Sequence, residues 1–230
     1  MSLFKTSDYF DLTEFQHKEL FDLEAPVWET LKKLKEFCSS FHYPTFQYEA
    51  PGAYFVNPSM IVIGEGTVVE PGAYIEGPCI IGKGCTIRHG AYLRGNVVVG
   101  DGCVIGHATE VKHSIFLNGA KAAHFAYVGD SILGNNVNFG AGTKCANVKL
   151  DKRLVIIDDN GSHIETGLKK CGAIVGDDAQ LGCNCVTNPG TLIGPRSRCY
   201  PCLNIGGVVH SDAIVKPASK NETILIKNDK

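Results

Sequence analysis

The chain has 230 residues, with 22 Lys and Arg against 24 Asp and Glu, giving a formal net charge of −2. This length suits one large domain or a domain with a small appendage. The near-neutral balance argues against a nucleic-acid-binding protein, which shows a basic stripe. The sequence holds no apolar run of about 18 residues that would span a membrane, and its start, MSLFKTSDYF, lacks the pattern of a signal peptide. We therefore expect a cytoplasmic protein without a membrane or nucleic-acid partner.

The first part of the chain, residues 1–48, carries a helical pattern. Apolar residues recur at helical spacing at Val27, Trp28, Leu31, Leu34, Phe37 and Cys38. Pro26 suits the first turn of a helix. This predicts one or two short helices that cover the first coil of the following domain, because an uncapped edge of strands recruits other chains.

A six-residue repeat begins after this segment. Every sixth residue is aliphatic at Ile63, Val69, Ile75, Ile81, Ile87, Leu93, Val99, Ile105, Val111 and Leu117. The residue four positions after each is usually small, as at Ala73, Cys79 and Cys85. A longer match lies on top of this pattern, because GAYIEGPCIIGKGC at 72–85 resembles GAYLRGNVVVGDGC at 90–103.

A period of six fits neither an amphipathic helix nor an ordinary half-buried strand. Three such hexads make a triangular coil, with aliphatic residues pointing inward on each side and glycine serving the corners. Coils of this kind stack at a strand spacing of about 4.8 Å and bury a continuous core. The repeat thus predicts an all-β solenoid over residues 49–217, followed by a peripheral tail at 218–230.

The repeat changes register twice. We expect a break after Ala123, then inward positions at Leu133, Phe139 and Cys145. A second break covers about residues 147–172, and the repeat returns at Val175, Leu181, Thr187, Ile193, Cys199 and Ile205. Breaks in a solenoid place loops on its outside, where chemistry is often carried.

Most of the ten cysteines have a structural explanation. Free cysteine behaves as a small hydrophobe. The repeat puts several at inward positions, namely Cys79, Cys85, Cys103, Cys185, Cys145 and Cys199. A single C-x-x-C at 199–202, near Cys183, leaves zinc binding as a minor alternative.

Residues that are 18 apart stack in columns on such a solenoid. One outward column reads Glu76, Arg94, Lys112. Arg94 and Lys112 repel one another unless an anion lies between them, or else Arg94 forms a surface pair with Glu76. A second column contains His89 and His107, with His113 one hexad further on, which raises the question of a metal site.

His124 follows at the first predicted break, with Tyr127, Asn138 and Asn147 after it. A histidine beside loops is a candidate general base, although a surface histidine has the same appearance. Asparagines in solenoids also form structural ladders.

The stretch HFAYVGDSILGNNVNFGAGTKCAN, with LRG at 93–95 and EVK at 110–112, resembles the acetyltransferase domain of the N-acetylglucosamine-1-phosphate uridyltransferase / glucosamine-1-phosphate acetyltransferase family. The resemblance covers roughly residues 60–217, while the hexads alone indicate only the hexapeptide-repeat acyltransferase superfamily. It implies a left-handed parallel β-helix, with a short helical segment before it.

The resemblance also implies roles on the sugar side. His124 would take the proton from the C2 amine of glucosamine 1-phosphate as this amine attacks acetyl-CoA, with Glu110 as an orienting residue. Arg94 and Lys112 would hold the sugar phosphate, and Tyr127 and Asn138 would bind the sugar. The product, N-acetylglucosamine 1-phosphate, serves UDP-N-acetylglucosamine synthesis.

On the cofactor side, the resemblance implies that Asn147, Val148 and the backbone at Ala141 lie along the acetyl-CoA path. A backbone N–H there would be the oxyanion donor. Cys183 and Pro201 stand where the family contacts coenzyme A further along, with Ser and Ala in their place. Acetyl transfer by this chemistry needs no metal.

The family forms homotrimers with each active site between neighbouring subunits, and we expect the same here. The family's nucleotidyltransferase domain is missing from this sequence, so uridylyl transfer is expected from a separate chain, if at all. The segment 148–172 resembles the longer loop of archaeal-type members. Basic residues there either meet coenzyme A phosphates or are solvated, at Lys152, Arg153, Lys169 and Lys170.

Three alternatives remain. A hexapeptide acyltransferase acting on a nucleotide-linked sugar fits the same pattern. A γ-class carbonic anhydrase would need His89, His107 and His113 to converge on zinc. A solenoid without catalytic activity would need none of the polar residues named above.

Overall fold

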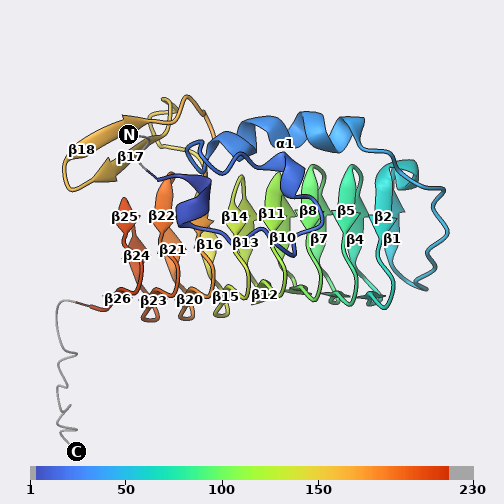
Figure 1. Ribbon diagram of the computed structural model, residues 1–230. Coiled ribbons are helices and arrows are strands. Elements are labelled where there is room, and N and C mark those ends of the chain that lie inside the picture. Colours follow the sequence, from blue (N-terminus) through green and yellow to red (C-terminus); the bar gives the residue numbers. More distant parts are fainter. Residues whose placement is uncertain (1–3, 218–230) are drawn as a thin grey trace, which may run out of the picture.

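Short parallel strands stack in three sheets that form the sides of a three-sided prism (Figure 1) in the computed structural model, which describes residues 4–217. Each sheet takes every third strand of the repeat and contains eight strands. The architecture confirms the predicted left-handed parallel β-helix. The predicted tail, 218–230, lies outside the described residues.

We number the faces by the strands that form them. The first face contains β1 Tyr54–Val56, β4 Tyr74–Glu76, β7 Tyr92–Arg94, β10 Glu110–Lys112, β13 Tyr127–Gly129, β16 Lys144–Cys145, β21 Val186–Thr187 and β24 Asn204–Ile205. The second contains β2 Ile61–Ile63, β5 Cys79–Ile81, β8 Val97–Val99, β11 Ser114–Phe116, β14 Ile132–Leu133, β19 Ala173–Val175, β22 Thr191–Ile193 and β25 Val208–Val209. The third contains β3 Val68–Val69, β6 Thr86–Ile87, β9 Val104–His107, β12 Lys121–His124, β15 Asn138–Phe139, β20 Gln180–Leu181, β23 Arg198–Cys199 and β26 Ile214–Val215.

The hexad repeat builds the interior of the prism. Ile75 pairs with Leu93 and Ile87 with Ile105, one coil apart, and all four side chains are fully buried. The six cysteines predicted at inward positions are buried and free. Stacked aliphatic and small side chains therefore form one continuous core, as the repeat predicts.

The first register change lies earlier than predicted. Val111 still pairs with Leu93, 18 residues before it, but Phe116 pairs with Val99, which is 17 residues before it. Phe116 therefore fills the inward position, and the prediction that Leu117 does so is wrong, because Leu117 packs in an outer cluster. One residue is missing from the corner that contains Lys112, His113 and Ser114. From Leu133 onward the predicted inward positions are correct.

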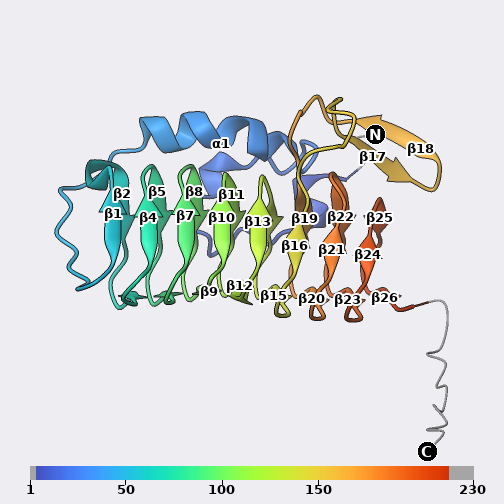
Figure 2. The same cartoon turned by 180° about the vertical axis from the view of Figure 1, so that it is seen from behind.

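A second apolar cluster covers the outside of the second face. Its helical elements are the 3₁₀ helices η1 Thr6–Asp8 and η2 Lys18–Leu20 and the α-helix α1 Glu29–Ser40. Leu31 and Leu34 of α1 are buried in one cluster with the outward residues Ile80, Val98 and Ile115. Figures 1 and 2 show α1 running along the side of the prism. The helix is thus present as predicted, but it lies along the flank rather than over the open end.

Other residues cover the first coil. Phe46, Tyr48 and Phe55 pack against the end of the core, and the Tyr48 hydroxyl donates to the Thr67 carbonyl and accepts from the Val69 N–H. A short 3₁₀ helix, η3 Pro58–Met60, lies between β1 and β2. Within residues 4–217, no helix combines the length and apolar character needed to cross a membrane.

The predicted outside loop at about 147–172 contains an antiparallel hairpin of β17 Ile156–Asp159 and β18 Ser162–Glu165. Val155 and Ile157 beside it are fully buried in the same outer cluster as Leu192. The hairpin and α1 lie on the same side of the prism in both views (Figures 1 and 2). They cover the second face, and the first and third faces keep exposed outward residues such as Tyr74 and Lys121.

Candidate active site

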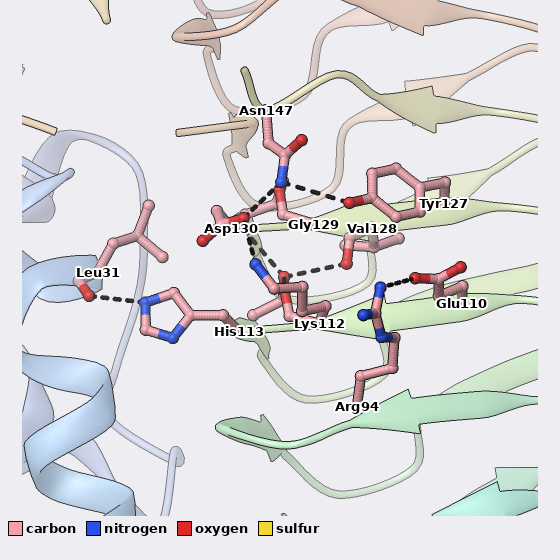
Figure 3. A network of polar contacts seen from close by, with 12 residues as sticks. Leu31, Arg94, Glu110, Lys112, His113, Tyr127, Val128, Gly129, Asp130 and Asn147 are labelled. Carbon is pink, nitrogen blue, oxygen red and sulfur yellow. Dashed lines mark hydrogen bonds and ion pairs between the residues drawn. The ribbon is translucent and has the colours of Figure 1, made fainter. Parts of the chain in front are cut away.

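A network of polar side chains lies at the edge of the first face where it turns into the second (Figure 3). The Asn147 amide donates from Nδ2 to Asp130 Oδ2 and to Tyr127 Oη, at 3.3 Å for the latter. Lys112 Nζ donates to Asp130 Oδ2 at 3.2 Å. Three successive coils thus meet at one carboxylate. We call Lys112, Tyr127, Asp130 and Asn147 the face cluster.

Asp130 is the residue of this cluster that sequence reasoning missed. It is 5% exposed and takes a positive φ of 48° at the corner after β13. A buried carboxylate is tolerated when it is paired and hydrogen-bonded, and here Lys112 and Asn147 supply both. The signal in the sequence was Gly-Asp directly after Tyr127 and Val128, an acidic residue at a corner otherwise suited to glycine or asparagine.

Tyr127 keeps its proton in this setting. Burial, together with the charges of Glu110 and Asp130, raises the pKa of Tyr127 above its ordinary value. Because its oxygen accepts a hydrogen bond from Asn147, the hydroxyl hydrogen remains for another acceptor. Tyr127 is therefore placed to donate to a ligand on the first face.

Arg94 lies one strand from Lys112, as the 18-residue column predicts, but its partner is not Glu76. Arg94 Nη1 donates to Glu110 Oε1 at 2.6 Å, and its guanidinium lies 5.5 Å from the centre of the Tyr92 ring. Glu110 thus pairs with Arg94 and Asp130 with Lys112. Glu110 contacts Arg94 rather than His124, so its expected orienting role is not observed.

A second group of residues forms a column along the edge between the third and first faces. Each successive coil places one residue of the column at this edge. Its backbone carbonyl accepts a hydrogen bond from the residue that directly follows the column member on the next coil. The hydrogen bonds are Ala108 N to His89 O (3.3 Å), Phe125 N to His107 O (2.9 Å), Gly142 N to His124 O (3.0 Å), Asn184 N to Ala141 O (2.8 Å) and Cys202 N to Cys183 O (2.8 Å). Pro201, which precedes Cys202, completes the edge column.

The early register change puts His124 in this column. His124 pairs with His107, which stacks on His89 with ring centres 5.7 Å apart and planes 13° from parallel. With an unbroken 18-residue repeat, Phe125 would have paired with His107 instead. His124 is exposed, because it is the last residue of β12 and lies at the corner where the chain turns from the third face to the first, beyond the inward residue Ala122. The edge column therefore unites four predicted site residues, namely His124, Ala141, Cys183 and Pro201.

The histidines proposed for a zinc site do not converge within one chain. His113 lies at the opposite edge of the first face, with Nε2 3.1 Å from the Leu31 carbonyl of α1. Burial lowers the pKa of His113, which keeps it neutral. The next member of the His89 and His107 column is His124. Among residues 4–217, no three His, Cys, Asp or Glu side chains are arranged to hold a metal ion.

The remaining predicted residues lie apart from both groups. Asn138 is on the third face, in register with Lys121 and Gln180, and does not join Tyr127 within one chain. Val148 follows Asn147 and is 42% exposed. The basic side chains of the outer loop are exposed, at Lys152, Arg153, Lys169 and Lys170.

Comparisons with known proteins find relatives of this chain. The family model described as the GMPPB C-terminal domain matches residues 75–166. The bifunctional sugar-1-phosphate nucleotidylyltransferase/acetyltransferase of Sulfurisphaera tokodaii is 42% identical over 103 residues, covering 45% of this chain and 25% of that protein. The bifunctional protein GlmU of Methanococcus maripaludis (strain C5) is 34% identical over 119 residues, covering 52% of this chain and 28% of that protein. The chain therefore spans about a quarter of the length of these curated relatives.

Solved structures agree on the fold. The UDP-N-acetylglucosamine acyltransferase of Francisella novicida superposes with a TM-score of 0.51 at 14% identity, covering 74% of this chain and 67% of that one. The relatives found by sequence confirm the resemblance stated from the sequence. The chain has the left-handed β-helix fold and resembles, over the matched residues, the acetyltransferase domain of the N-acetylglucosamine-1-phosphate uridyltransferase / glucosamine-1-phosphate acetyltransferase family.

Proposed function

We propose that this chain transfers the acetyl group of acetyl-CoA to the amino group of an amino-sugar 1-phosphate, with glucosamine 1-phosphate as the preferred substrate. The observation that carries the proposal is the edge column. It aligns the exposed imidazole of His124 with Ala141, Cys183 and Pro201 on consecutive coils, beside the first face that holds Arg94 and Lys112. A long, thin cofactor laid along this edge would present its thioester to the imidazole.

Arg94 and Lys112 would bind the sugar phosphate. Only one N–H of the Arg94 guanidinium is used by Glu110, and the two side chains are 42% and 34% exposed. An exposed pair of this kind contributes about 0–1 kcal/mol, so Arg94 can redirect donors to a phosphate at little cost. Lys112 is held more firmly, because its partner Asp130 has a side chain only 7% exposed.

His124 would act as the general base. It takes a proton from the C2 amine of the sugar as the lone pair of this nitrogen attacks the thioester carbonyl carbon. The tetrahedral oxyanion collapses, the carbon–sulfur bond breaks, and the imidazolium returns the proton to the coenzyme A thiolate. Tyr127, with a free hydroxyl hydrogen, would orient the sugar from the first face.

The N–H of Ala141 is the proposed oxyanion donor. At the first position of the same column, the His89 N–H points out of the ladder and donates to Glu70 Oε2 at 2.8 Å. Ala141 occupies the equivalent place one coil beyond His124. A backbone donor at this corner is preorganised by the ladder, which is the arrangement that stabilises developing charge most effectively.

A homotrimer would complete the site. His124 is exposed on an edge, and Asn138 lies on a different face from Tyr127, so one chain does not enclose a sugar phosphate. The second face is already covered by α1 and the β17–β18 hairpin, which leaves the first and third faces for neighbouring copies. Sedimentation velocity on the purified chain checks this part of the proposal.

Release of the coenzyme A thiol tests the activity. Wild-type protein is assayed with acetyl-CoA and the 1-phosphates of glucosamine and galactosamine, with their nucleotide-linked forms alongside. We expect turnover with glucosamine 1-phosphate and its loss in His124→Ala. Turnover only with a nucleotide-linked sugar would correct the substrate, and no turnover with any of them would contradict the proposal.

A further inference from the structure

Two cysteines differ from all the others in the described chain. All ten cysteines are free, but only Cys183 and Cys202 are exposed. The Cys202 N–H donates to the Cys183 carbonyl at 2.8 Å, so the two residues lie on adjacent coils. Cys183 lies opposite Pro201, so Cys202 is one coil and one residue away. With a strand spacing of about 4.8 Å and a rise of about 3.3 Å per residue, the two Cα atoms lie about 6 Å apart, within the range of about 4.4–6.8 Å that a disulfide spans. The backbone therefore places these two residues at a separation that a disulfide can span.

The surrounding cysteines are protected from reaction. Burial raises the pKa of Cys145 and Cys199 to about 11 and that of Cys171 to about 12. A thiol reacts as its thiolate, so buried cysteines with raised pKa values are inert. Cys185, between the two coils, is buried and directs its Sγ at the Tyr200 carbonyl at 3.1 Å. Cys183 and Cys202 are thus the cysteines of this part of the solenoid that are open to exchange chemistry.

The pair also lies at a defined place relative to the edge column. Cys183 follows Ala141 in the column, and Cys202 directly follows Pro201. If the proposed function holds, the coenzyme A moiety runs along these coils. A disulfide whose leaving group is coenzyme A would then be recognised by the same edge, so the inference rests on the proposed function for its specificity.

We propose that Cys183 and Cys202 form a thiol pair that exchanges with the disulfide form of coenzyme A. The Cys183 thiolate attacks one sulfur, a new Cys183–coenzyme A disulfide forms, the old sulfur–sulfur bond breaks, and one coenzyme A thiolate leaves. The Cys202 thiolate then attacks the Cys183 sulfur, forming the Cys183–Cys202 disulfide and releasing the second coenzyme A thiolate. Two cysteine thiols are oxidised, the coenzyme A disulfide is reduced to two thiols, and the two cysteine protons pass to solvent.

The exchange would regulate the proposed activity. The intermediate places a coenzyme A moiety covalently where the free cofactor would run, and the final disulfide ties two coils together at that position. Either product excludes acetyl-CoA from the edge column, and a thiol reductant restores access. The chain would then respond to the ratio of coenzyme A disulfide to thiol.

The test follows the two thiols by mass spectrometry of the folded protein after treatment with coenzyme A disulfide. We expect a Cys183–Cys202 disulfide in wild type, reversed by dithiothreitol, and one stable coenzyme A adduct on Cys183 in Cys202→Ser. Cys183→Ser should form no cross-link and react slowly. The rate with coenzyme A disulfide should exceed the rate with hydroxyethyl disulfide by on the order of tenfold, which corresponds to about 1.4 kcal/mol of recognition.

Separate adducts on both cysteines without a cross-link would overturn the proposal, as would equal rates with the two disulfides. No readout uses turnover. The His124→Ala variant, which the proposed function makes inactive, must give the same cross-link at the same rate. Failure of the acetyltransferase proposal and failure of the thiol pair are therefore separable.

Discussion

The second face and the edge column use the same backbone in opposite ways. Outward residues of the second face are apolar, and Ile80, Val98 and Ile115 are at most 2% exposed because the N-terminal segment covers them. At the edge between the third and first faces, the outward residues are histidines, alanine, cysteine and proline, and His124 remains exposed. The coil geometry is thus the same on both sides and does not itself determine what binds there. The outward side chains decide whether a side of the prism binds the chain's own segments or stays free for a ligand.

Removal of the His124 imidazole should have the largest effect on activity. His124→Ala should lower kcat by about 10²–10⁴-fold, the usual contribution of a positioned general base. Because His124 is exposed, the free energy of unfolding should barely change. His107→Ala, one coil away in the same column, is the matched control and should keep most of the activity. Equal activity of His124→Ala and wild type would rule out the base.

On the covered face, the largest expected effect is on stability. Ile115→Ala removes a fully buried side chain between the prism and the N-terminal segment and should cost about 2–5 kcal/mol in urea unfolding. Tyr74→Ala, at an outward and 38% exposed position of the first face, should cost far less. Similar losses in the two variants would show that the faces do not differ as described.

Asp130→Asn tests the face cluster. Asparagine tolerates the positive φ at this corner, so the substitution mainly removes the charge that pairs with Lys112. We expect a loss of about 1–3 kcal/mol in stability, since a part-buried charge loses its partner. The KM for the sugar phosphate should change while the KM for acetyl-CoA stays near wild type. An effect on acetyl-CoA alone would place the cluster on the cofactor side.

The smallest effect concerns pH and the docking of α1. Burial lowers the pKa of His113, and burial also lowers that of His17 in the N-terminal segment. Since the folded pKa is below the unfolded value of about 6.5, the unfolded chain binds more protons, and stability should fall as the pH drops through 6.5. His113→Asn should flatten this dependence in urea unfolding measured between neutral and mildly acidic pH. An unchanged slope would show that His113 does not titrate with unfolding.

The hexads predicted the prism and nearly all its inward residues, because a strict repeat forces each coil onto the last. They misplaced the first register change, since Phe116 and Leu117 are both suitable for the core and the missing residue at the preceding corner leaves no other mark. That error mattered, because the shorter coil is what aligns His124 with His107.

The face cluster and the cover of the second face were harder to predict. Asp130 accepts hydrogen bonds from Lys112 and Asn147, which come from two other coils. The spacing of residues in the sequence predicts which side chains share a column, but it does not predict which of them form hydrogen bonds with one another. The apolar outward positions Ile80, Val98 and Ile115 were visible as strand residues, but their partner in the N-terminal segment is far away in sequence.

The account depends most on where the cofactor binds. A crystal structure of the chain with coenzyme A and glucosamine 1-phosphate tests this directly. We expect the pantetheine arm along Ala141, Cys183 and Pro201, with its thiol beside His124 and the sugar phosphate against Arg94 and Lys112. Coenzyme A bound on another face, or a thiol remote from every His124 imidazole in the assembly, would contradict it.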